Sequence, residues 1–211
     1  ILGFPTSDSK DVEETLNNLK FVLPYQPLRK VRFWLGQNSP VDLNPEQFGI
    51  LNVANHPHYK KLLPDSLAES LCLMIKTYRG DRTKQKKLWR PVARELASWQ
   101  ERYRLLRKDH FPAVLLGYRD GGDFLLIRRR TRDYQMETFR LKGFSRDIYR
   151  FCETRRTLEQ IHHEFPRVSS DKLEKFISHM VNKRLMFGEG KEVLSLAVNE
   201  EPHRVLCGED P

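Results

Sequence analysis

Residues 113–130 read AVLLGYRDGGDFLLIRRR, and this stretch decides the fold of the second half of the chain. Two apolar runs, Ala113–Tyr118 and Phe124–Arg130, flank the sequence Asp120-Gly121-Gly122-Asp123. Glycine adopts positive φ at little steric cost, so this pattern predicts two strands joined by a hairpin turn. Tyr134–Leu141 alternates polar and apolar side chains in the same way, which predicts a three-stranded sheet.

Three short helices follow the predicted sheet. Residues that favour helix N-termini stand at their starts, at Ser145, Thr157 and Ser169. Apolar residues on both sides of Gly188–Lys191 then predict a second β-hairpin. Three helices followed by a hairpin are typical of a winged helix. We therefore expect a three-stranded sheet with a winged-helix-like three-helix unit.

The first 36 residues predict a different arrangement. Ile1-Leu2 resembles the end of a buried strand, the helical spacing of apolar residues from Val12 to Leu23 predicts a helix, and Lys30–Leu35 predicts a strand. Strand, helix and strand in this order predict a βαβ unit whose first strand has lost its beginning. A short native N-terminus after removal of Met is the alternative. Residues 37–64, rich in proline and asparagine, predict a long loop.

The middle of the chain predicts basic helices. A helix is expected over Asp65–Tyr78, and a longer one over Lys84–Lys108, where Pro91 allows two helices in line. One apolar seam runs along the longer helix through Trp89, Val92, Leu96, Trp99, Tyr103 and Leu106. Between Lys76 and His110, twelve Lys and Arg stand against four Asp and Glu. This surface suits either phosphate and nucleic acid or, more simply, solvent and an acidic neighbouring domain.

The composition excludes several classes of protein. The chain has 211 residues, a formal net charge of +9 and 39% hydrophobic residues, which suits one or two folded domains. No stretch approaches the ~18 apolar residues of a membrane span. Cys72, Cys152 and Cys207 are few and far apart, which argues against a secreted disulfide framework and predicts a cytoplasmic protein. His56 and His58 are possible ligands, but the interpretation as a surface loop is favoured.

Gly3-Phe4-Pro5, with the acidic amphipathic helix that follows, resembles the late-barrel motif of radical S-adenosylmethionine enzymes. The motif of that family is Gly-Phe-Pro-Gly-Glu-Thr, and in this chain Thr6-Ser7 replaces its Gly-Glu. Further segments, in the same order, resemble a cobalamin-binding branch that includes peptide-maturing C-methyltransferases and anaerobic magnesium-protoporphyrin monomethyl ester cyclases: Pro27–Arg32, Ser39-Pro40, Phe48–Ile50 and Pro57–Lys60. Leu141–Gly143 and Arg156–Ile161 resemble the C-terminal region of this branch, and also the winged-helix leader-binding domains of peptide-modifying systems.

The resemblance implies a C-terminal portion of such an enzyme, acting on a tetrapyrrole or a ribosomal peptide. The parent would carry a four-iron, four-sulfur cluster, S-adenosylmethionine and cobalamin, whereas its C-x3-C-x2-C loop would lie before Ile1. We expect the 211-residue chain to bind none of these groups by itself and to be catalytically inert. Its partners would be the missing N-terminal domains and the substrate. Gly3, Phe4 and Pro5 would line the adenosyl site.

The expected fold class is thus α+β: a truncated βαβ piece of a radical barrel, a helical linker, and the sheet with its winged-helix-like unit. The expected boundaries of barrel remnant, basic linker, accessory domain and polar tail are 1–64, 65–110, 111–198 and 199–211. The alternative to an enzyme fragment is a free-standing peptide-binding module, in which the sheet accepts a peptide as an added strand. Its candidate contact residues are Met136, Phe139, Leu173, Phe176 and Ile177; each is also a candidate core residue. Nucleic-acid binding is the weakest hypothesis.

Overall fold

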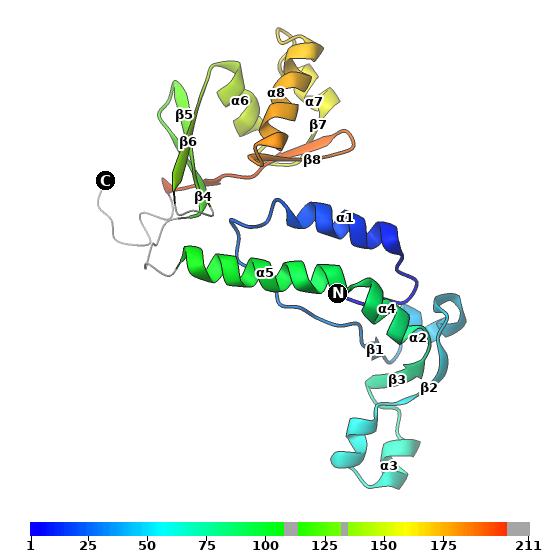
Figure 1. Cartoon of the computed structure of the whole chain (residues 1–211). Coiled ribbons are helices and arrows are strands. Elements are labelled where there is room, and N and C mark those ends of the chain that lie inside the picture. The colour runs from blue at the N-terminus through cyan, green and yellow to red at the C-terminus, as the bar shows by residue number, and fades with distance from the viewer. Residues whose placement is uncertain (108–113, 132–134, 202–211) are drawn as a thin grey trace. The chain divides into compact units, whose positions relative to one another are not determined.

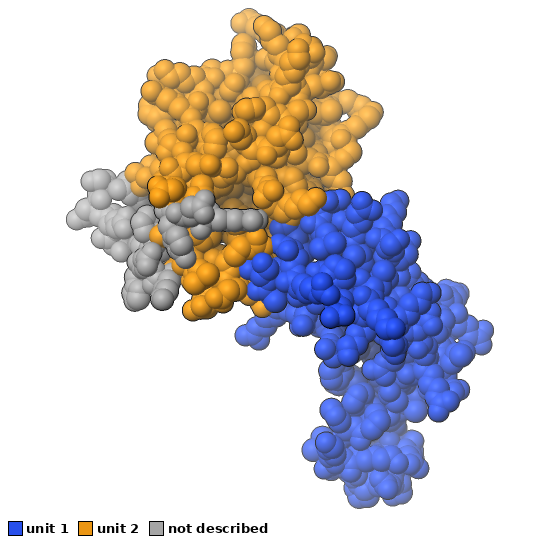
Figure 2. Space-filling model, viewed as in Figure 1, with its two compact units in different colours: residues 1–19, 28–98 blue, residues 20–27, 99–211 orange. Residues whose placement is uncertain are grey.

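The computed structural model describes residues 1–107, 114–131 and 135–201 and confirms a mixed α+β chain. The chain divides into two compact units (Figure 2). Unit 1 comprises residues 1–19 and 28–98, and unit 2 comprises residues 20–27 and 99–211. The chain therefore passes between the two units three times: before residue 20, after residue 27, and between residues 98 and 99. The last crossing lies within one helix, α5 (Arg90–Leu106).

Unit 1 begins with a parallel connection across helix α1 (Ser9–Leu19). Leu2 pairs in parallel with Arg32: the Leu2 amide donates to the Val31 carbonyl at 2.8 Å, and the Phe33 amide donates to the Leu2 carbonyl at 3.0 Å. Asp8 caps the start of α1, since its carboxylate accepts bonds from the amides of residues 10 and 11. The expected order of strand end, helix and parallel strand is present, although the pairing is one isolated bridge.

The sheet of unit 1 corrects two predictions. Its order is β1-β3-β2, all antiparallel, with β1 at Leu35–Gly36, β2 at Leu51–Asn55 and β3 at Ile75–Arg79. The helix expected over Asp65–Tyr78 is therefore wrong in its second half, since α3 ends at Ser70. The loop expected over 37–64 also contains a strand. Short helical turns connect these strands, namely α2 (Pro40–Leu43), η1 (Pro45–Phe48), η2 (Pro57–Lys61) and α3 (Asp65–Ser70).

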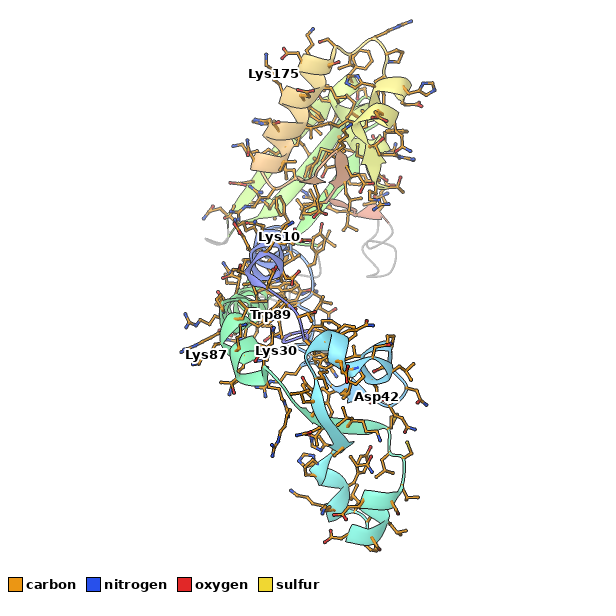
Figure 3. The ribbon with its side chains drawn as sticks, turned by 90° about the vertical axis from the view of Figure 1, so that its right-hand side faces the viewer. Lys10, Lys30, Asp42, Lys87, Trp89 and Lys175 are labelled. Atoms are coloured by element: carbon orange, nitrogen blue, oxygen red, sulfur yellow. The ribbon has the colours of Figure 1, made fainter. Side chains whose placement is uncertain are left out.

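Two helices in line follow this sheet, as Pro91 indicated: α4 (Arg82–Leu88) and α5 (Arg90–Leu106). The predicted apolar seam is confirmed, because Trp89, Val92, Trp99 and Leu106 are buried. Trp89 and Val92 pack with Val12 of α1, and Leu16 and Leu19 join this cluster. Figure 3 shows Lys87 on the outer side of the helices and Trp89 on the side of α1. Lys84, Lys86, Lys87, Arg90 and Arg94 of these helices are exposed.

The main sheet of unit 2 has the order β10-β4-β5-β6. Figure 1 labels β4, β5 and β6 of this sheet. Its strands are β4 (Leu116–Asp120), β5 (Phe124–Arg130), β6 (Met136–Lys142) and β10 (Val198–Asn199). The three expected antiparallel strands are confirmed, and the fourth, β10, lies parallel to β4. The polar tail expected from residue 199 is therefore wrong in its first residues: Asn199 belongs to β10, and the Glu200 amide donates to the Tyr118 carbonyl at 3.0 Å. The Glu200 carboxylate is buried and pairs with Arg119 at 2.7 Å and with Arg128.

Three helices and a small sheet complete unit 2. They follow the order α6 (Phe144–Phe151), β7 (Arg156–Thr157), α7 (Leu158–Glu164), α8 (Ser170–Asn182), β8 (Met186–Glu189) and β9 (Glu192–Ser195). Both β7 and β8 pair antiparallel with β9, so the small sheet has the order β7-β9-β8. Thr157 caps α7 as expected, and it forms a reciprocal capping box with Gln160.

One hydrophobic core joins the main sheet to these helices. It contains Leu125 and Ile127 from β5, Ile148 and Tyr149 from α6, and Ile161 from α7. The fully buried Tyr149 hydroxyl donates to the Leu185 carbonyl at 2.8 Å and accepts from the Ala197 amide at 3.0 Å. Burial raises the pKa of this phenol far above its usual range, so it stays a neutral donor.

Candidate functional site

Strand β6 is an edge strand, because β5 is its single strand partner within the described part of the chain. The Thr131 amide donates to the Gln135 carbonyl at 2.8 Å, which fixes residues 131 and 135 as a hydrogen-bonded pair. Pairs alternate along an antiparallel ladder, so Arg129–Glu137 and Ile127–Phe139 are hydrogen-bonded too. The amides and carbonyls of residues 136, 138 and 140 consequently point away from β5, toward the free edge.

The two faces of β6 differ in character. Phe139 and Leu141 turn inward and pack against the core of unit 2. Met136, Thr138 and Arg140 lie on the opposite face and are exposed. A strand added at this edge would therefore place alternate side chains beside the core-facing residues and beside the exposed row.

Arg129 fixes the end of α8 beside this ladder. Its guanidinium pairs with Glu137 of β6 at 2.5 Å and donates to the Lys183 carbonyl just after α8. The guanidinium carbon also lies 5.5 Å from the centre of the Phe139 ring. One side chain thus links β5, β6 and the C-terminal turn of α8, and sets the separation between the helix end and the strand edge.

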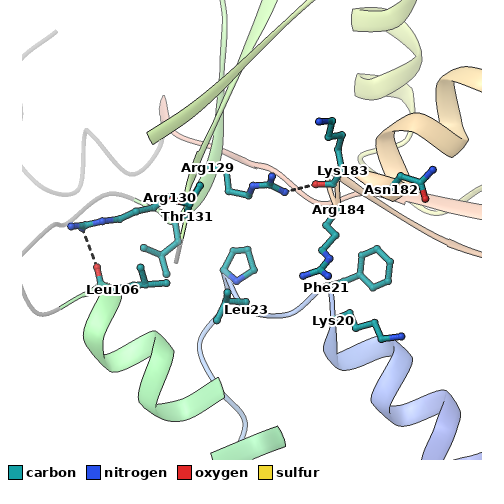
Figure 4. A pocket seen from close by; sticks show the side chains of 12 residues that line it. Lys20, Phe21, Leu23, Leu106, Arg129, Arg130, Thr131, Asn182, Lys183 and Arg184 are labelled. Atoms are coloured by element: carbon teal, nitrogen blue, oxygen red, sulfur yellow. Dashed lines mark hydrogen bonds between the residues drawn. The ribbon is translucent and has the colours of Figure 1, made fainter. Parts of the chain in front are cut away.

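A pocket of about 320 Å³ opens at the same end of unit 2 (Figure 4). Apolar side chains form part of its wall: Phe21, Leu23, Pro24, Leu106 and Leu115. Its polar lining is cationic or neutral: Lys20, Arg129, Arg130, Thr131, Asn182, Lys183 and Arg184. The Arg130 guanidinium donates to the Leu106 carbonyl at 3.0 Å, which joins the end of α5 to β5. None of these twelve lining residues is acidic.

The five residues predicted to bind a peptide divide between surface and core. Leu173 and Ile177 of α8 are buried, at 1% and 8% exposure, and belong to the core. Phe139 and Phe176 are half-buried against that core, so each presents part of its ring to the surface. Met136 is 45% exposed on the opposite face of β6. The structure thus places Phe139 and Phe176 on one core cluster and does not bring Met136 to it.

Gly3, Phe4 and Pro5 lie in unit 1 at the turn that precedes α1. Gly3 has φ of +74°, which explains glycine at this position. The Phe4 ring packs edge-on against Phe33 and Phe48, at centroid distances of 5.2 and 6.0 Å. Pro5 lines a cavity of about 420 Å³ beside the first residues of α1.

Gln85 closes that cavity from α4. Its side-chain amide donates to the Ser7 carbonyl at 2.9 Å and so fixes the turn before α1. Its carbonyl oxygen is buried without a hydrogen-bond partner. A partly apolar cavity next to a helix start is compatible in chemistry with a nucleoside, and it offers Gln85 as an acceptor.

Two histidines of unit 1, His56 and His58, lie side by side. The rings of His56 and His58 lie 4.6 Å apart, and His56 accepts a bond from the amide of His58. Burial and the nearby positive charges of His58 and Arg82 lower the pKa of His56. Among residues 1–107, 114–131 and 135–201, no group of three His, Cys, Asp or Glu side chains is placed to hold a metal ion.

The cysteines of the described residues do not form the site that a four-iron cluster needs. A four-iron cluster with an open iron needs three neighbouring thiolates. Cys72 is exposed in unit 1, and Cys152 is buried in unit 2. Burial raises the pKa of the Cys152 thiol to about 12, which keeps it protonated and unreactive. Cys207 lies outside the described residues.

An ion-pair network holds α6 against β4. The Asp120 carboxylate accepts bonds from Arg146 at 2.8–3.1 Å and from Arg150 at 2.6 Å. Burial raises the pKa of Asp120, but the bonds from Arg146 and from the Gly122 amide outweigh it and leave the pKa below its usual range. The Tyr118 hydroxyl donates to Glu153 at 2.8 Å in the same region.

Comparison with known proteins provides no family for this chain: no family model, curated protein or solved structure matches it. No helix in the described part of the chain is long and apolar enough to cross a membrane.

Several residues of the site had no signal in the sequence. Arg129 and Arg184 stand among many basic residues, and their roles depend on which end of the sheet meets the end of α8. Phe21 and Leu23 were assigned to the N-terminal barrel piece, yet they line a pocket of unit 2. A pattern of charge and periodicity cannot reveal such a contact, because it arises from chain crossing between units.

Proposed function

We propose that unit 2 is a winged-helix-like module that binds a peptide by strand addition at the free edge of β6. The exposed amides and carbonyls of residues 136, 138 and 140 carry this proposal, because they offer an unpaired ladder for a partner strand. Phe139 and Phe176 would contact its apolar side chains. Leu173 and Ile177 would support Phe176 from within the core, and Met136 would contact the exposed side of the added strand.

The topology of unit 2 supports this assignment. In a winged helix, a short strand after the first helix pairs with the second strand of the wing. Here β7 follows α6 and pairs with β9, and β9 pairs with β8. The three-stranded meander that precedes α6 agrees with the resemblance to leader-binding domains of peptide-modifying systems, and it supplies the free edge.

A substitution at Thr138 tests the edge directly. Proline has no amide hydrogen, and it is tolerated at edge strands where the amide faces away from the ladder. Thr138→Pro therefore removes one donor toward the peptide and leaves the bonds to β5 in place. Thr138→Val is the matched control, since it keeps the amide and changes the same side chain.

The measurement uses the full chain and a displayed library of random dodecapeptides. Enriched peptides are synthesised with a fluorophore, and their affinities are measured by fluorescence anisotropy. We expect Thr138→Pro to weaken binding about 10-fold, the cost of one bond with its neighbours disturbed, and Thr138→Val to bind like the wild type. Failure to enrich any peptide, or equal binding by both variants, contradicts strand addition at β6.

We further propose that unit 1 is the end of a partial barrel from a larger cobalamin-dependent radical enzyme that acts on a peptide or tetrapyrrole. The parallel bridge between Leu2 and Arg32 across α1 supports it. Unit 1 also carries eleven of the fourteen exposed large apolar side chains of the described residues, Trp34 and Met74 among them. Such a surface is typical of one that packs against further protein, here the barrel strands of the parent.

Two measurements test this second proposal. The reading frame upstream of Ile1 should encode a C-x3-C-x2-C loop, because three thiolates must hold the cluster. The 211-residue chain itself should not consume S-adenosylmethionine under anaerobic reduction. Turnover by this chain, or an upstream frame without the three cysteines, contradicts the assignment.

A further inference from the structure

The pocket at the end of unit 2 contains a residue in an unusual conformation. Arg184 follows the end of α8 with φ of +56°, a region that glycine favours and L side chains rarely adopt. Its amide donates to the Val181 carbonyl at 2.8 Å, and the Leu185 amide donates to the Met180 carbonyl at 2.9 Å. These two bonds define a Schellman motif, in which the position of Arg184 is usually glycine.

Arg184 thus occupies a position whose backbone conformation is less strained for glycine than for arginine. Figure 4 shows its side chain directed into the pocket, between Phe21 and Leu23. No carboxylate of the described residues pairs with it, in contrast to Arg129, which is bonded to Glu137. The side chain of the neighbouring Lys183 points in the opposite direction to that of Arg184 (Figure 4).

We propose that this pocket binds an acidic side chain, flanked by an apolar one, of the peptide whose strand is added at β6. Arg184 would pair with the carboxylate, and the apolar wall of Phe21, Leu23 and Leu115 would cover the neighbouring side chain. The inference rests on the proposed function and names its substrate class as an acidic-apolar peptide. Arginine suits this role because its planar fork bonds both oxygens of a carboxylate.

The position of the pocket agrees with one continuous peptide. Arg130 and Thr131 line the pocket, and Arg130 is the register partner of Met136, the first residue of β6. An added strand would lie two strand spacings from β5, roughly 10 Å. About three extended residues beyond the paired segment would therefore reach Arg184.

The apolar wall favours a peptide over a nucleic acid. A phosphate backbone would use the cations and leave Phe21, Leu23 and Pro24 without a partner. Nucleic-acid surfaces are also extended cationic stripes, whereas this pocket is a single hollow. The two ligand classes also differ in how their affinity responds to salt. A nucleic acid held by several phosphate contacts releases counterions on binding, so its affinity falls steeply as the salt concentration rises.

Arg184→Gly separates binding from folding, since glycine is the residue that the backbone conformation favours. This variant should melt at the temperature of the wild type or higher. Lys183→Ala is the matched control: Lys183 also lines the pocket, but its side chain points away from that of Arg184, so the variant removes a neighbouring positive charge and leaves Arg184 in place. Peptides enriched from the random dodecapeptide library by the wild type should carry Asp or Glu next to an apolar residue, at a fixed distance from a strand-forming segment.

We expect Arg184→Gly to bind such a peptide about 10- to 100-fold more weakly, and to bind its Glu→Gln version like the wild type does. Lys183→Ala should retain wild-type preference for the acidic version. If enriched peptides show no acidic preference but still lose affinity with Thr138→Pro, the pocket assignment is wrong and strand addition stands. If the library yields no peptide, both proposals fail.

Two further measurements, with inorganic phosphate and with a DNA duplex, test whether the pocket binds another kind of anion. Inorganic phosphate that raises the melting temperature of the wild type, but not of Arg184→Gly, without any peptide preference would indicate a small-anion site and overturn the peptide assignment. Tight binding of a labelled DNA duplex with a steep salt dependence, lost in Arg184→Gly, would do the same in favour of nucleic acid.

Discussion

At the scale of single residues, the arginines of unit 2 differ in what they contact. Arg129 joins two strands to a helix end, and Arg119 and Arg128 neutralise the buried Glu200. Arg184 makes no such contact and accepts an unfavourable backbone conformation. An L residue in the left-handed region costs ~1 kcal/mol, so Arg184→Gly should raise the free energy of unfolding by up to about 1 kcal/mol. A gain in stability with a loss of binding is the signature of a functional side chain.

Asp120 predicts how the stability of unit 2 depends on pH. Its pKa in the folded chain lies below the value of about 4 of the unfolded chain. The stabilisation is therefore complete above pH 4 and is lost as pH falls through the lower, folded-state pKa. Asp120→Asn should melt below the wild type at pH 7, and this difference should shrink toward pH 2.5. Measuring melting temperatures across this range checks it.

Asp171→Asn is the control for that series. Asp171 is exposed on α8 and pairs with Lys175 alone, at 2.7 Å. Exposed pairs of this kind contribute little, so its substitution should shift the melting temperature much less at every pH. A constant difference between Asp120→Asn and the wild type down to pH 2.5 would show that the carboxylate charge is not what stabilises the contact.

At the scale of helices and strands, the N-termini of α7 and α8 provide a matched pair. The Thr157 hydroxyl accepts a bond from the Gln160 amide at 3.2 Å. Ser169 stands at the same position of α8 and makes no capping bond through its side chain. Thr157→Ala should therefore lower the free energy of unfolding by ~1 kcal/mol, and Ser169→Ala by less. Urea unfolding of the full chain measures both; equal losses would contradict the role of the cap.

Local patterns predicted the elements of unit 2 well. The glycine turn at residues 120–123, the alternation of β6 and the cap at Thr157 each depend on neighbours in sequence, and the structure has all three. Strand β3 was predicted as helix because Ile75 and Tyr78 have helical spacing after α3. Pairing with β1 and β2 decides that segment instead. Strand β10 was not predicted, because two residues are too few to show a period, and its pairing with β4 depends on a segment far away in the sequence.

The candidate site was predictable in part. The free edge of β6 and the position of Phe139 follow from alternation, whereas the fate of Leu173 and Ile177 does not. Their helical spacing is equally typical of residues that line a surface groove and of residues in a core. The contacts of α8 place both of them in the core. The pocket could not be predicted, because Phe21 and Leu23 reach it from a distant part of the chain.

At the scale of the whole chain, residues 20–27 link the N-terminal region to unit 2. The Trp99 indole donates to the Tyr25 carbonyl at 3.2 Å, and the Tyr25 hydroxyl donates to the Leu196 carbonyl. Burial raises the pKa of Tyr25 to about 12. The Phe21 ring packs edge-on against Phe187 of the wing at 5.2 Å. The small sheet is thus supported by residues far from it in sequence.

Tyr25→Phe tests this support with a minimal change. It leaves the Leu196 carbonyl without its donor, so it should lower the stability of unit 2 by ~1 kcal/mol. Hydrogen exchange of the full chain should then show faster exchange in β8 and β9, whereas amides of β2 and β3 in unit 1 keep their wild-type rates. Equal acceleration in both units would mean that they unfold as one body.

The interleaved course of the chain constrains how it folds during synthesis. Residues 20–27 leave the ribosome well before their partners Trp99, Phe187 and Leu196, and Leu196 follows Tyr25 by 171 residues. For most of that time Phe21, Leu23 and Tyr25 have no native surface to cover them. The nascent chain therefore carries an exposed aromatic segment that a ribosome-associated chaperone can bind, and ribosome-bound chains stalled before Leu196 should retain such a chaperone longer than released ones.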